Sequence, residues 1–176
     1  MKRRCGAEAG VITAIGLSFV FGFFGSRVSA QTGSTTPRTV KEEAIVATHA
    51  TGTFDVKISP QPPQDNVGDP TVGRLSIDKQ FHGDLDATSK GQMLTAMTDV
   101  KDSAGYVAIE RVNGTLNGRS GTFALQHTGT MTRGEPQLVI TVVPDSGTGQ
   151  LVGLAGKMTI TIADGKHSYA FEYTVP

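Results

Sequence analysis

Short runs in which apolar and polar residues alternate one by one recur along the chain from about residue 44 onward. In Gly73–Phe81, for example, Leu75, Ile77 and Phe81 alternate with polar side chains. A period of two residues is typical of β-strands, because successive side chains of a strand point to opposite faces. Further runs with this period are Phe54–Ile58, Gln92–Thr98, Phe123–Met131, Met158–Ile162 and His167–Val175. No segment has a convincing helical period, and the nearest candidate is a brief turn around Gly149–Gly156.

Glycine, proline, aspartate and asparagine separate these runs and predict where the chain reverses. The clearest case is Ala104–Gly129, which is typical of two strands joined by a glycine-rich turn. Asn-Gly and Asp-Gly pairs favour tight hairpins, because both residues tolerate positive φ angles. The predicted turns are Pro60–Pro70, Asp102-Ser103, Asn113-Gly114, Asn117-Gly118, Arg133-Gly134 and Asp164-Gly165. Leu138–Val143 is almost wholly apolar, so we expect this strand to be covered on both faces.

The fold class that this pattern predicts is all-β. Sequential hairpins of about eight antiparallel strands close most economically into a barrel, because closure removes exposed strand edges. The interior of a barrel of about eight strands is either packed solid or holds one small ligand. A sandwich of two sheets is the alternative that the same pattern allows.

The N-terminal segment, residues 1–30, has the layout of a secretory signal peptide. It begins with the positive residues Lys2, Arg3 and Arg4, continues with the apolar run Val11–Phe24, and ends in small residues at Ala30. The apolar run is shorter than the roughly twenty residues that span a bilayer, which argues against a membrane anchor. We therefore expect cleavage after Ala30 and an exported protein, periplasmic or secreted, without a membrane segment once the signal is removed.

The remaining chain divides into a flexible linker, residues 31–46, and a single barrel domain, residues 47–176. The linker is polar and rich in threonine and serine. The sole cysteine, Cys5, lies in the signal segment, so the mature chain can form no disulfide of its own. Cleavage also removes four basic residues and one acidic residue, which leaves a net charge of about −3. No basic stripe with interleaved aromatic residues is present, which argues against nucleic acid as a partner. The oligomeric state stays open.

Several motifs, in order and well spaced, resemble the bacterial family called domain of unknown function 3224. They are Lys79-x-Phe81-x-Gly83-Asp84-Leu85, Gly114-Thr115-Leu116-x-Gly118-Arg119-x-Gly121-x-Phe123, Leu125-Gln126-His127-x-Gly129, Pro144-x-Ser146-Gly147-Thr148-Gly149-x-Leu151-x-Gly153-Leu154-x-Gly156, His167-x-Tyr169 and Glu172-Tyr173. The resemblance covers roughly Ala47–Val175. It implies a closed antiparallel barrel with a central cavity, similar to that of allene oxide cyclase, and it implies no particular reaction. Similarity of fold to a cyclase is an analogy only.

His127 and Lys79 are polar residues on the apolar faces of their strands. An inward imidazole requires hydrogen-bond partners, and burial or a carboxylate could move its pKa into a range useful for catalysis. The alternative for His127 is a core histidine satisfied by a neighbouring hydroxyl. An ammonium in an apolar row must pair, reach the rim or lose its proton, and for Lys79 we expect it to reach the rim.

Glu110 shares a strand face with Tyr106, so together with His127 these residues could form a general acid/base set in a barrel cavity. Glu172, by contrast, points outward by parity. The full set of predicted ligand-binding residues is Lys79, Phe81, Tyr106, Glu110, Phe123, His127, Tyr169 and Tyr173, of which His127, Glu110 and Tyr106 are also the catalytic candidates.

Other chemistries have weaker support in the sequence. Asp145-Ser146-Gly147-Thr148 matches the aspartic-protease signature, but that chemistry requires two such loops, and a turn between strands explains this segment better. The four histidines are scattered and form no pair with metal-ligand spacing, so we expect neither a metal nor a cofactor.

Three functions remain compatible with the sequence. The first is a barrel that binds a small, partly apolar molecule in its lumen. The second is an isomerase- or cyclase-like enzyme on the same barrel, so whether the protein is an enzyme stays open. The third is a solidly packed barrel that binds another protein through its surface. Cavity volume separates the third from the others.

The signal peptide leads to a direct prediction about the mature protein. N-terminal sequencing or intact-mass measurement of the exported form should place its first residue at Gln31. An exported, membrane-bound form that retains Met1 would contradict the interpretation.

Overall fold

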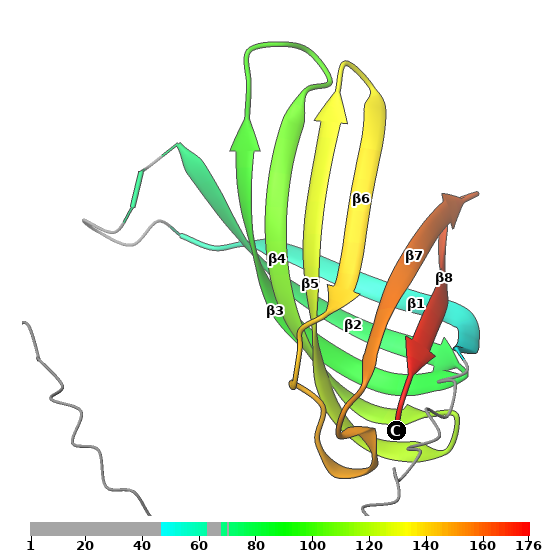
Figure 1. Ribbon diagram of the computed structural model, residues 1–176. Helices are drawn as coiled ribbons and strands as arrows, with labels where there is room; N and C mark the ends of the chain where they lie inside the picture. Colours follow the sequence, from blue (N-terminus) through cyan, green and yellow to red (C-terminus); the bar gives the residue numbers. More distant parts are fainter. Residues whose placement is uncertain (1–46, 63–67, 70) are drawn as a thin grey trace, which may run out of the picture. The chain divides into compact units, whose positions relative to one another are not determined.

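The computed structural model describes residues 47–62, 68–69 and 71–176. They form eight strands: β1 (Thr48–Pro60), β2 (Val72–Gly83), β3 (Leu85–Met97), β4 (Ala104–Leu116), β5 (Arg119–Thr132), β6 (Glu135–Val142), β7 (Ala155–Ala163) and β8 (Lys166–Thr174), with one short 3₁₀ helix, η1 (Gly149–Leu151), before β7. Each strand pairs antiparallel with its neighbour in sequence, and β8 returns to β1, which closes a barrel (Figure 1). The predicted barrel is confirmed, and the sandwich is excluded.

The alternating pattern determines which side chains face the interior. Along β5, Phe123, Leu125 and His127 are buried, whereas Gln126 and Thr128 are exposed. Inward side chains fill one end of the barrel, the end that holds the β2–β3 and β4–β5 turns and the loop with η1. We call it the packed end. Its buried residues include Phe54, Phe81, Leu85, Val112, Leu116, Phe123, Leu125, Leu151, Leu154, Tyr169, Phe171 and Tyr173.

At the other end, inward apolar side chains remain in contact with solvent. Inward positions there carry Ile58, Met131, Leu138 and Ile162, whose exposed fractions are 51%, 41%, 42% and 65%. We call this inner surface the mouth; it also includes Leu75, Met93, Met97 and Tyr106, and Val56 and Ile160, which pack against the core, form its lower edge. The strand pairing explains the exposure, because β6 and β7 pair at only two positions and then diverge, as Figure 1 shows.

Three sequence-based expectations about local structure need correction. Asn113-Gly114 lies inside β4 and forms no turn; the β4–β5 hairpin instead reverses at Asn117-Gly118, where both φ angles are positive. The strand predicted from Gln92 begins earlier, at Leu85. Leu138–Val143 is not covered on both faces, because Val139 and Thr141 on its outward side are exposed. The predicted turn near Gly149 is confirmed as η1.

The predicted signal peptide and linker, residues 1–46, lie outside the described residues. The part of the chain that the structure describes contains no helix with the length and hydrophobicity that a membrane span requires.

A buried tyrosine hydroxyl connects three strands at the packed end. Tyr169, on β8, accepts a hydrogen bond from the backbone N–H of Leu85 at 2.9 Å and donates one to the carbonyl of His82 at 3.2 Å. Tyr173, two residues further along the same face, instead accepts a hydrogen bond from the side chain of Asn117 at 2.9 Å. The hydroxyl of Tyr169 thus pairs with two backbone groups, whereas that of Tyr173 pairs with one exposed side chain.

Tyr169→Phe should destabilise the barrel by about 1–3 kcal/mol, because the buried N–H of Leu85 loses its acceptor. Tyr173→Phe is the matched control: Asn117 is exposed and can bond to water, so the cost should stay below about 1 kcal/mol. Urea unfolding followed by circular dichroism measures both. Equal losses for the two variants would contradict this role of Tyr169.

Candidate functional site

Four polar side chains from four consecutive strands meet on the inner face, between the packed end and the mouth. They are Lys79 on β2, Ser89 on β3, Glu110 on β4 and His127 on β5. Lys79 lies directly opposite Ser89 in the strand pairing. Glu110 lies one inward position further toward the mouth, opposite Gly91, and His127 lies two inward positions further, opposite Ala108. We call these four residues the polar cluster.

Glu110 is the centre of the polar cluster. Its Oε1 accepts hydrogen bonds from Lys79 Nζ at 2.8 Å and from His127 Nε2 at 2.9 Å, and its Oε2 accepts one from the hydroxyl of Ser89 at 2.8 Å. The exposed fractions are 0% for Glu110, 2% for Ser89, 4% for His127 and 8% for Lys79. The carboxylate is therefore completely enclosed, and the two nitrogen-bearing side chains lie closer to solvent.

Glycine at position 91 allows close approach of β4 at Glu110. A Cβ on Gly91 would lie 2.6 Å from Glu110 Cβ and 2.8 Å from Glu110 Cα, which is closer than atoms can pack. Gly129 serves Tyr106 in the same way, because a Cβ there would overlap the tyrosine ring. Glycine at these two inward positions thus lets the backbone of β4 and the ring of Tyr106 pack closely against the neighbouring strands.

Opposing effects set the protonation of Glu110. Burial raises the pKa of its carboxyl group, but the hydrogen bond from His127 and the charge and hydrogen bond of Lys79 outweigh burial and lower the pKa to about 2. Glu110 is thus a carboxylate at neutral pH. Because Lys79 and Glu110 carry opposite charges, the cluster with a neutral His127 has no net charge.

The contact with Glu110 also determines the tautomer of His127. A carboxylate only accepts hydrogen bonds, so Nε2 of His127 must carry a proton. Nδ1 then holds a lone pair when the ring is neutral, and it has no hydrogen-bond partner within the described residues. Every fully buried side-chain nitrogen and oxygen in that part of the chain does have a partner. Nδ1 is therefore not completely buried, although the His127 side chain as a whole is only 5% exposed.

Lys79 does not reach the rim of the barrel, contrary to the sequence-based expectation. It is buried and paired with Glu110, and its Nζ lies 5.0 Å from the ring centre of Phe54 and 5.5 Å from that of Phe81. Ammonium groups at such distances are attracted to aromatic faces. Because the Glu110 carboxylate and the two aromatic rings attract the Lys79 ammonium, its pairing inside the barrel is more favourable than extension of the side chain toward solvent.

Tyr106 completes the group that the sequence singled out, although no hydrogen bond within the described residues joins it to Glu110. It lies two inward positions closer to the mouth than Glu110 on β4, and its ring covers Gly129. Burial raises the pKa of its hydroxyl, and the negative charge of Glu110 raises it further. Glu110 and His127 thus form a hydrogen-bonded pair, with a protonated Tyr106 above them.

The other predicted ligand-binding residues lie at the packed end. Phe81, Phe123, Tyr169 and Tyr173 are at most 5% exposed and pack in the aromatic core. Sequence reasoning missed Ser89, which holds the second oxygen of Glu110. The inward series Leu85, Ala87, Ser89, Gly91 and Met93 carries a usable signal, because small residues at three successive inward positions indicate space for a neighbour's side chain.

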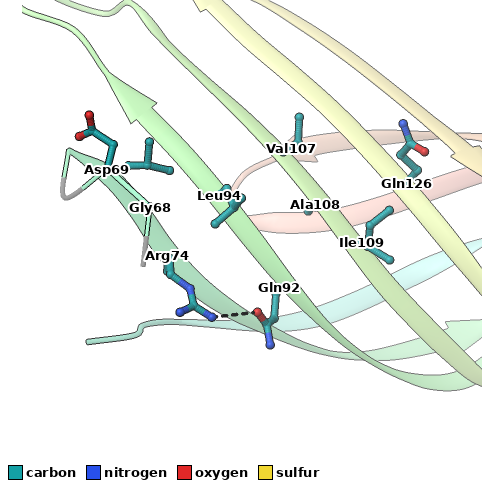
Figure 2. A pocket seen from close by; sticks show the side chains of 10 residues that line it. Gly68, Asp69, Arg74, Gln92, Leu94, Val107, Ala108, Ile109 and Gln126 are labelled. Carbon is teal, nitrogen blue, oxygen red and sulfur yellow. Dashed lines mark hydrogen bonds between the residues drawn. The ribbon is translucent and has the colours of Figure 1, made fainter. Parts of the chain in front are cut away.

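A hollow of about 820 Å³ lies on the outer face of β2–β5, away from the polar cluster. Figure 2 shows the side chains that line it, among them Arg74, whose guanidinium donates to Gln92 at 3.3 Å. Its apolar walls are Val72, Leu94, Val107 and Ile109, from outward positions of their strands. The hollow is thus an apolar surface with one cation, Arg74, and one anion, Asp69, and it shares none of the predicted site residues.

The protease-like segment has structural roles. The Ser146 hydroxyl accepts from the N–H of Ala124 and donates to the carbonyl of Val143, and Thr148 bonds to Thr122 through its backbone and hydroxyl. These bonds attach the loop to β5. Within the described residues, no three histidine, cysteine or acidic side chains are grouped to hold a metal.

The polar cluster should make the stability of the protein depend on pH in the acid range. The pKa of Glu110 is lower in the folded state, about 2, than its ordinary value of 4.5, so its stabilisation is complete above 4.5 and is lost as pH falls toward 2. Between pH 4.5 and pH 2, the free energy of unfolding of wild type should fall by about 3 kcal/mol more than that of Glu110→Gln, because glutamine cannot titrate. Urea unfolding measures both.

Glu172→Gln is the control for this measurement. Its carboxylate points outward and pairs with Lys157 at 3.3 Å on the surface, where ion pairs contribute about 1 kcal/mol or less. This variant should retain the pH dependence of wild type. A Glu110→Gln variant whose stability follows the wild-type curve through the acid range would show that the carboxylate is not held as described.

Comparisons with known proteins agree with the fold and with the motifs. Residues 50–173 match the family model described as protein of unknown function (DUF3224). A crystal structure at 1.84 Å of a protein with unknown function from the DUF3224 family, from Shewanella oneidensis MR-1, is 50% identical. That likeness covers 74% of this chain and 99% of the other, with a TM-score of 0.68. No curated protein matches the chain. The chain therefore belongs to the DUF3224 family, and its fold is the closed eight-stranded barrel described above.

Proposed function

We propose that the barrel binds a small, partly apolar molecule at its mouth, with the polar cluster as the floor of the site. The observation that carries this proposal is the exposure of Ile58, Met131, Leu138 and Ile162 at inward positions. Aliphatic side chains on the inside of a closed barrel are ordinarily buried, so leaving them wet is unfavourable by roughly 25 cal/mol for each Å². A ligand that covers them recovers this free energy.

The floor supplies the polar contacts that give such a site specificity. Binding sites for small molecules combine apolar walls with a few polar groups held in fixed positions. Here Glu110 holds His127 through Nε2 and leaves Nδ1 free. Of the residues predicted from sequence, we assign Lys79, Tyr106, Glu110 and His127 to the floor and lower wall. Phe81, Phe123, Tyr169 and Tyr173 belong to the core at the packed end and would support this floor.

A specific observation favours proton transfer on the bound molecule as a second function. An imidazole whose one nitrogen donates to a carboxylate and whose other nitrogen is free has the arrangement of a general base. Glu110 would be a positioning residue and Tyr106 a proton donor near the same ligand. An isomerase- or cyclase-like reaction needs only these groups.

We also propose that the protein works outside the cytoplasm, in the periplasm or the surrounding medium. This rests on the charged start, apolar run and small residues of segment 1–30. A site that captures a partly apolar molecule suits an exported carrier or sensor.

Adjacent residues on β6 provide a matched test of binding at the mouth. Leu138 points inward and is 42% exposed, and Val139 points outward and is 61% exposed, so neither contributes much to the core. Native mass spectrometry of the protein from its host's exported fraction should detect a bound small molecule. Leu138→Asn should reduce its occupancy about tenfold, which corresponds to about 1.4 kcal/mol, and Val139→Asn should leave it unchanged. A ligand-free mass, or equal loss in both variants, would contradict the proposal.

A further inference from the structure

We propose that the ligand of the mouth is an amphipathic monocarboxylic acid, whose carboxylate bonds to Nδ1 of His127, and that His127 takes up one proton as this ligand binds. The inference rests on the proposed function, because it names the ligand class for the same site. It follows from which hydrogen-bonding positions of the polar cluster are occupied and which are free.

Glu110 has little capacity left for a ligand. It is fully buried, its Oε1 accepts from both Lys79 and His127, and its Oε2 accepts from Ser89. A ligand that needs an acceptor carboxylate, such as an amine, would have to displace one of these bonds. The groups nearer to solvent are both nitrogen bases, and one of them, Lys79, already carries a positive charge against two aromatic rings.

Two groups of the cluster have hydrogen-bonding capacity left: Nζ of Lys79 uses one of its three donors, on Glu110, and Nδ1 of His127 has no partner within the described residues. Of the two, only Nδ1 can accept a hydrogen bond and take up a proton. The charged or titratable groups that face His127 are Lys79 from β2, and Glu110 and Tyr106 from β4. On β6, the strand that pairs with it on the other side, the inward residues are Pro136, Leu138, Ile140 and Val142, none of which titrates. A proton that arrives at Nδ1 would thus lie close to one negative and one positive side chain.

Charge balance selects an acid over an alcohol or an amine. With His127 protonated, the cluster has two positive charges and one negative charge, so one anion restores neutrality in a poorly solvated place. Imidazolium would then lie between two carboxylates, Glu110 at Nε2 and the ligand at Nδ1. A hydrogen bond between charged partners is roughly twice as strong as a neutral one, which is all an alcohol could form. Lys79 disfavours an ammonium ligand by repulsion.

The walls above the floor determine the rest of the ligand. Toward the mouth from Lys79 and Glu110, the inward positions of the strands carry no aspartate, glutamate, lysine or arginine. Their side chains are mainly aliphatic, and the ring of His167 packs on Phe54 at 5.1 Å. A molecule that fits this surface has a single acidic group at one end and an apolar body.

The outer hollow offers a competing place for such a molecule, because Arg74 lies beside the apolar side chains of Leu94 and Val107. The two places differ in the group that would meet the carboxylate. Arg74 is a permanent cation and binds an anion without taking up a proton, whereas a neutral His127 needs one. Proton uptake therefore distinguishes the mouth from the outer hollow.

Isothermal titration calorimetry with octanoate, octanol and octylammonium at neutral pH tests the proposal. Octanoate should bind about tenfold more tightly than octanol, in line with a charge-assisted bond, and octylammonium should bind most weakly. Repeating the octanoate titration in phosphate and in Tris, which differ in ionisation enthalpy, gives the number of protons exchanged. We expect net proton uptake on octanoate binding, since the ring gains a proton when the carboxylate bonds to Nδ1.

Two matched variants locate the bound carboxylate. His127→Gln keeps an amide donor for Glu110 but cannot titrate, so it should abolish proton uptake and lower octanoate affinity to that of octanol. Arg74→Gln should change neither quantity. Circular dichroism melting checks that both variants are folded, and the proton count of wild type needs no variant at all.

The outcomes separate this inference from the proposed function. If octanol binds as tightly as octanoate, or octanoate binds without proton uptake, and Leu138→Asn still weakens binding, the mouth is a site but the inference is overturned. If Arg74→Gln abolishes octanoate binding, the acid belongs to the outer hollow and the inference is overturned. If the probes bind but neither His127→Gln nor Leu138→Asn affects them, both proposals fail.

Discussion

The carboxylate of Glu110 is the constraint on which the middle of this barrel depends. It is completely enclosed, yet it stays ionised because Lys79 and His127 donate to the same oxygen and Ser89 donates to the other. Removing any one donor leaves part of a buried charge unsatisfied, which costs far more than the bond itself contributes. The four residues come from four neighbouring strands, so this one set of bonds also fixes how β2 to β5 are placed against one another across the barrel wall.

The polar cluster also divides the interior into two parts with different chemistry. Toward the packed end, aromatic rings such as Phe81 and Phe171 fill the space and exclude water. Toward the mouth, β6 and β7 separate after two paired positions, and the inward aliphatic side chains remain wet. A charged group in the packed end would be unfavourable because it would lose its contact with water, and one in the mouth would be solvated and not held in a single geometry. At the boundary, it is buried enough to be held in one geometry and close enough to solvent for His127 to meet a ligand.

The sequence predicts the fold better than it predicts the site, and the reason is the range of the interactions. Alternation along each strand, with Asn117-Gly118 and Asp164-Gly165 at reversals, is local information, and the barrel follows from it. It also placed Glu110 and His127 on inward faces. The pairing of Lys79 with Glu110 depends on strand register across thirty-one positions of sequence, which no local pattern carries. Asn113-Gly114 misled for the related reason that tertiary pairing overrides a turn-forming dipeptide: Gly114 lies directly opposite Ala87 and Gly121, where β4 needs close contact on both sides.

A buried ion pair of this kind is a poor way to stabilise a barrel. Replacing such a pair with well-packed apolar residues of similar volume is often neutral or stabilising, whereas breaking it is severely destabilising. The direct cross-strand neighbours of Ser89 and Glu110, which are Val112 and Leu125, are apolar and belong to the core. The polar cluster therefore calls for an explanation other than stability. The free nitrogen of His127 is the feature that an apolar replacement could not supply, and this supports a role for the cluster in recognising a polar group at the mouth.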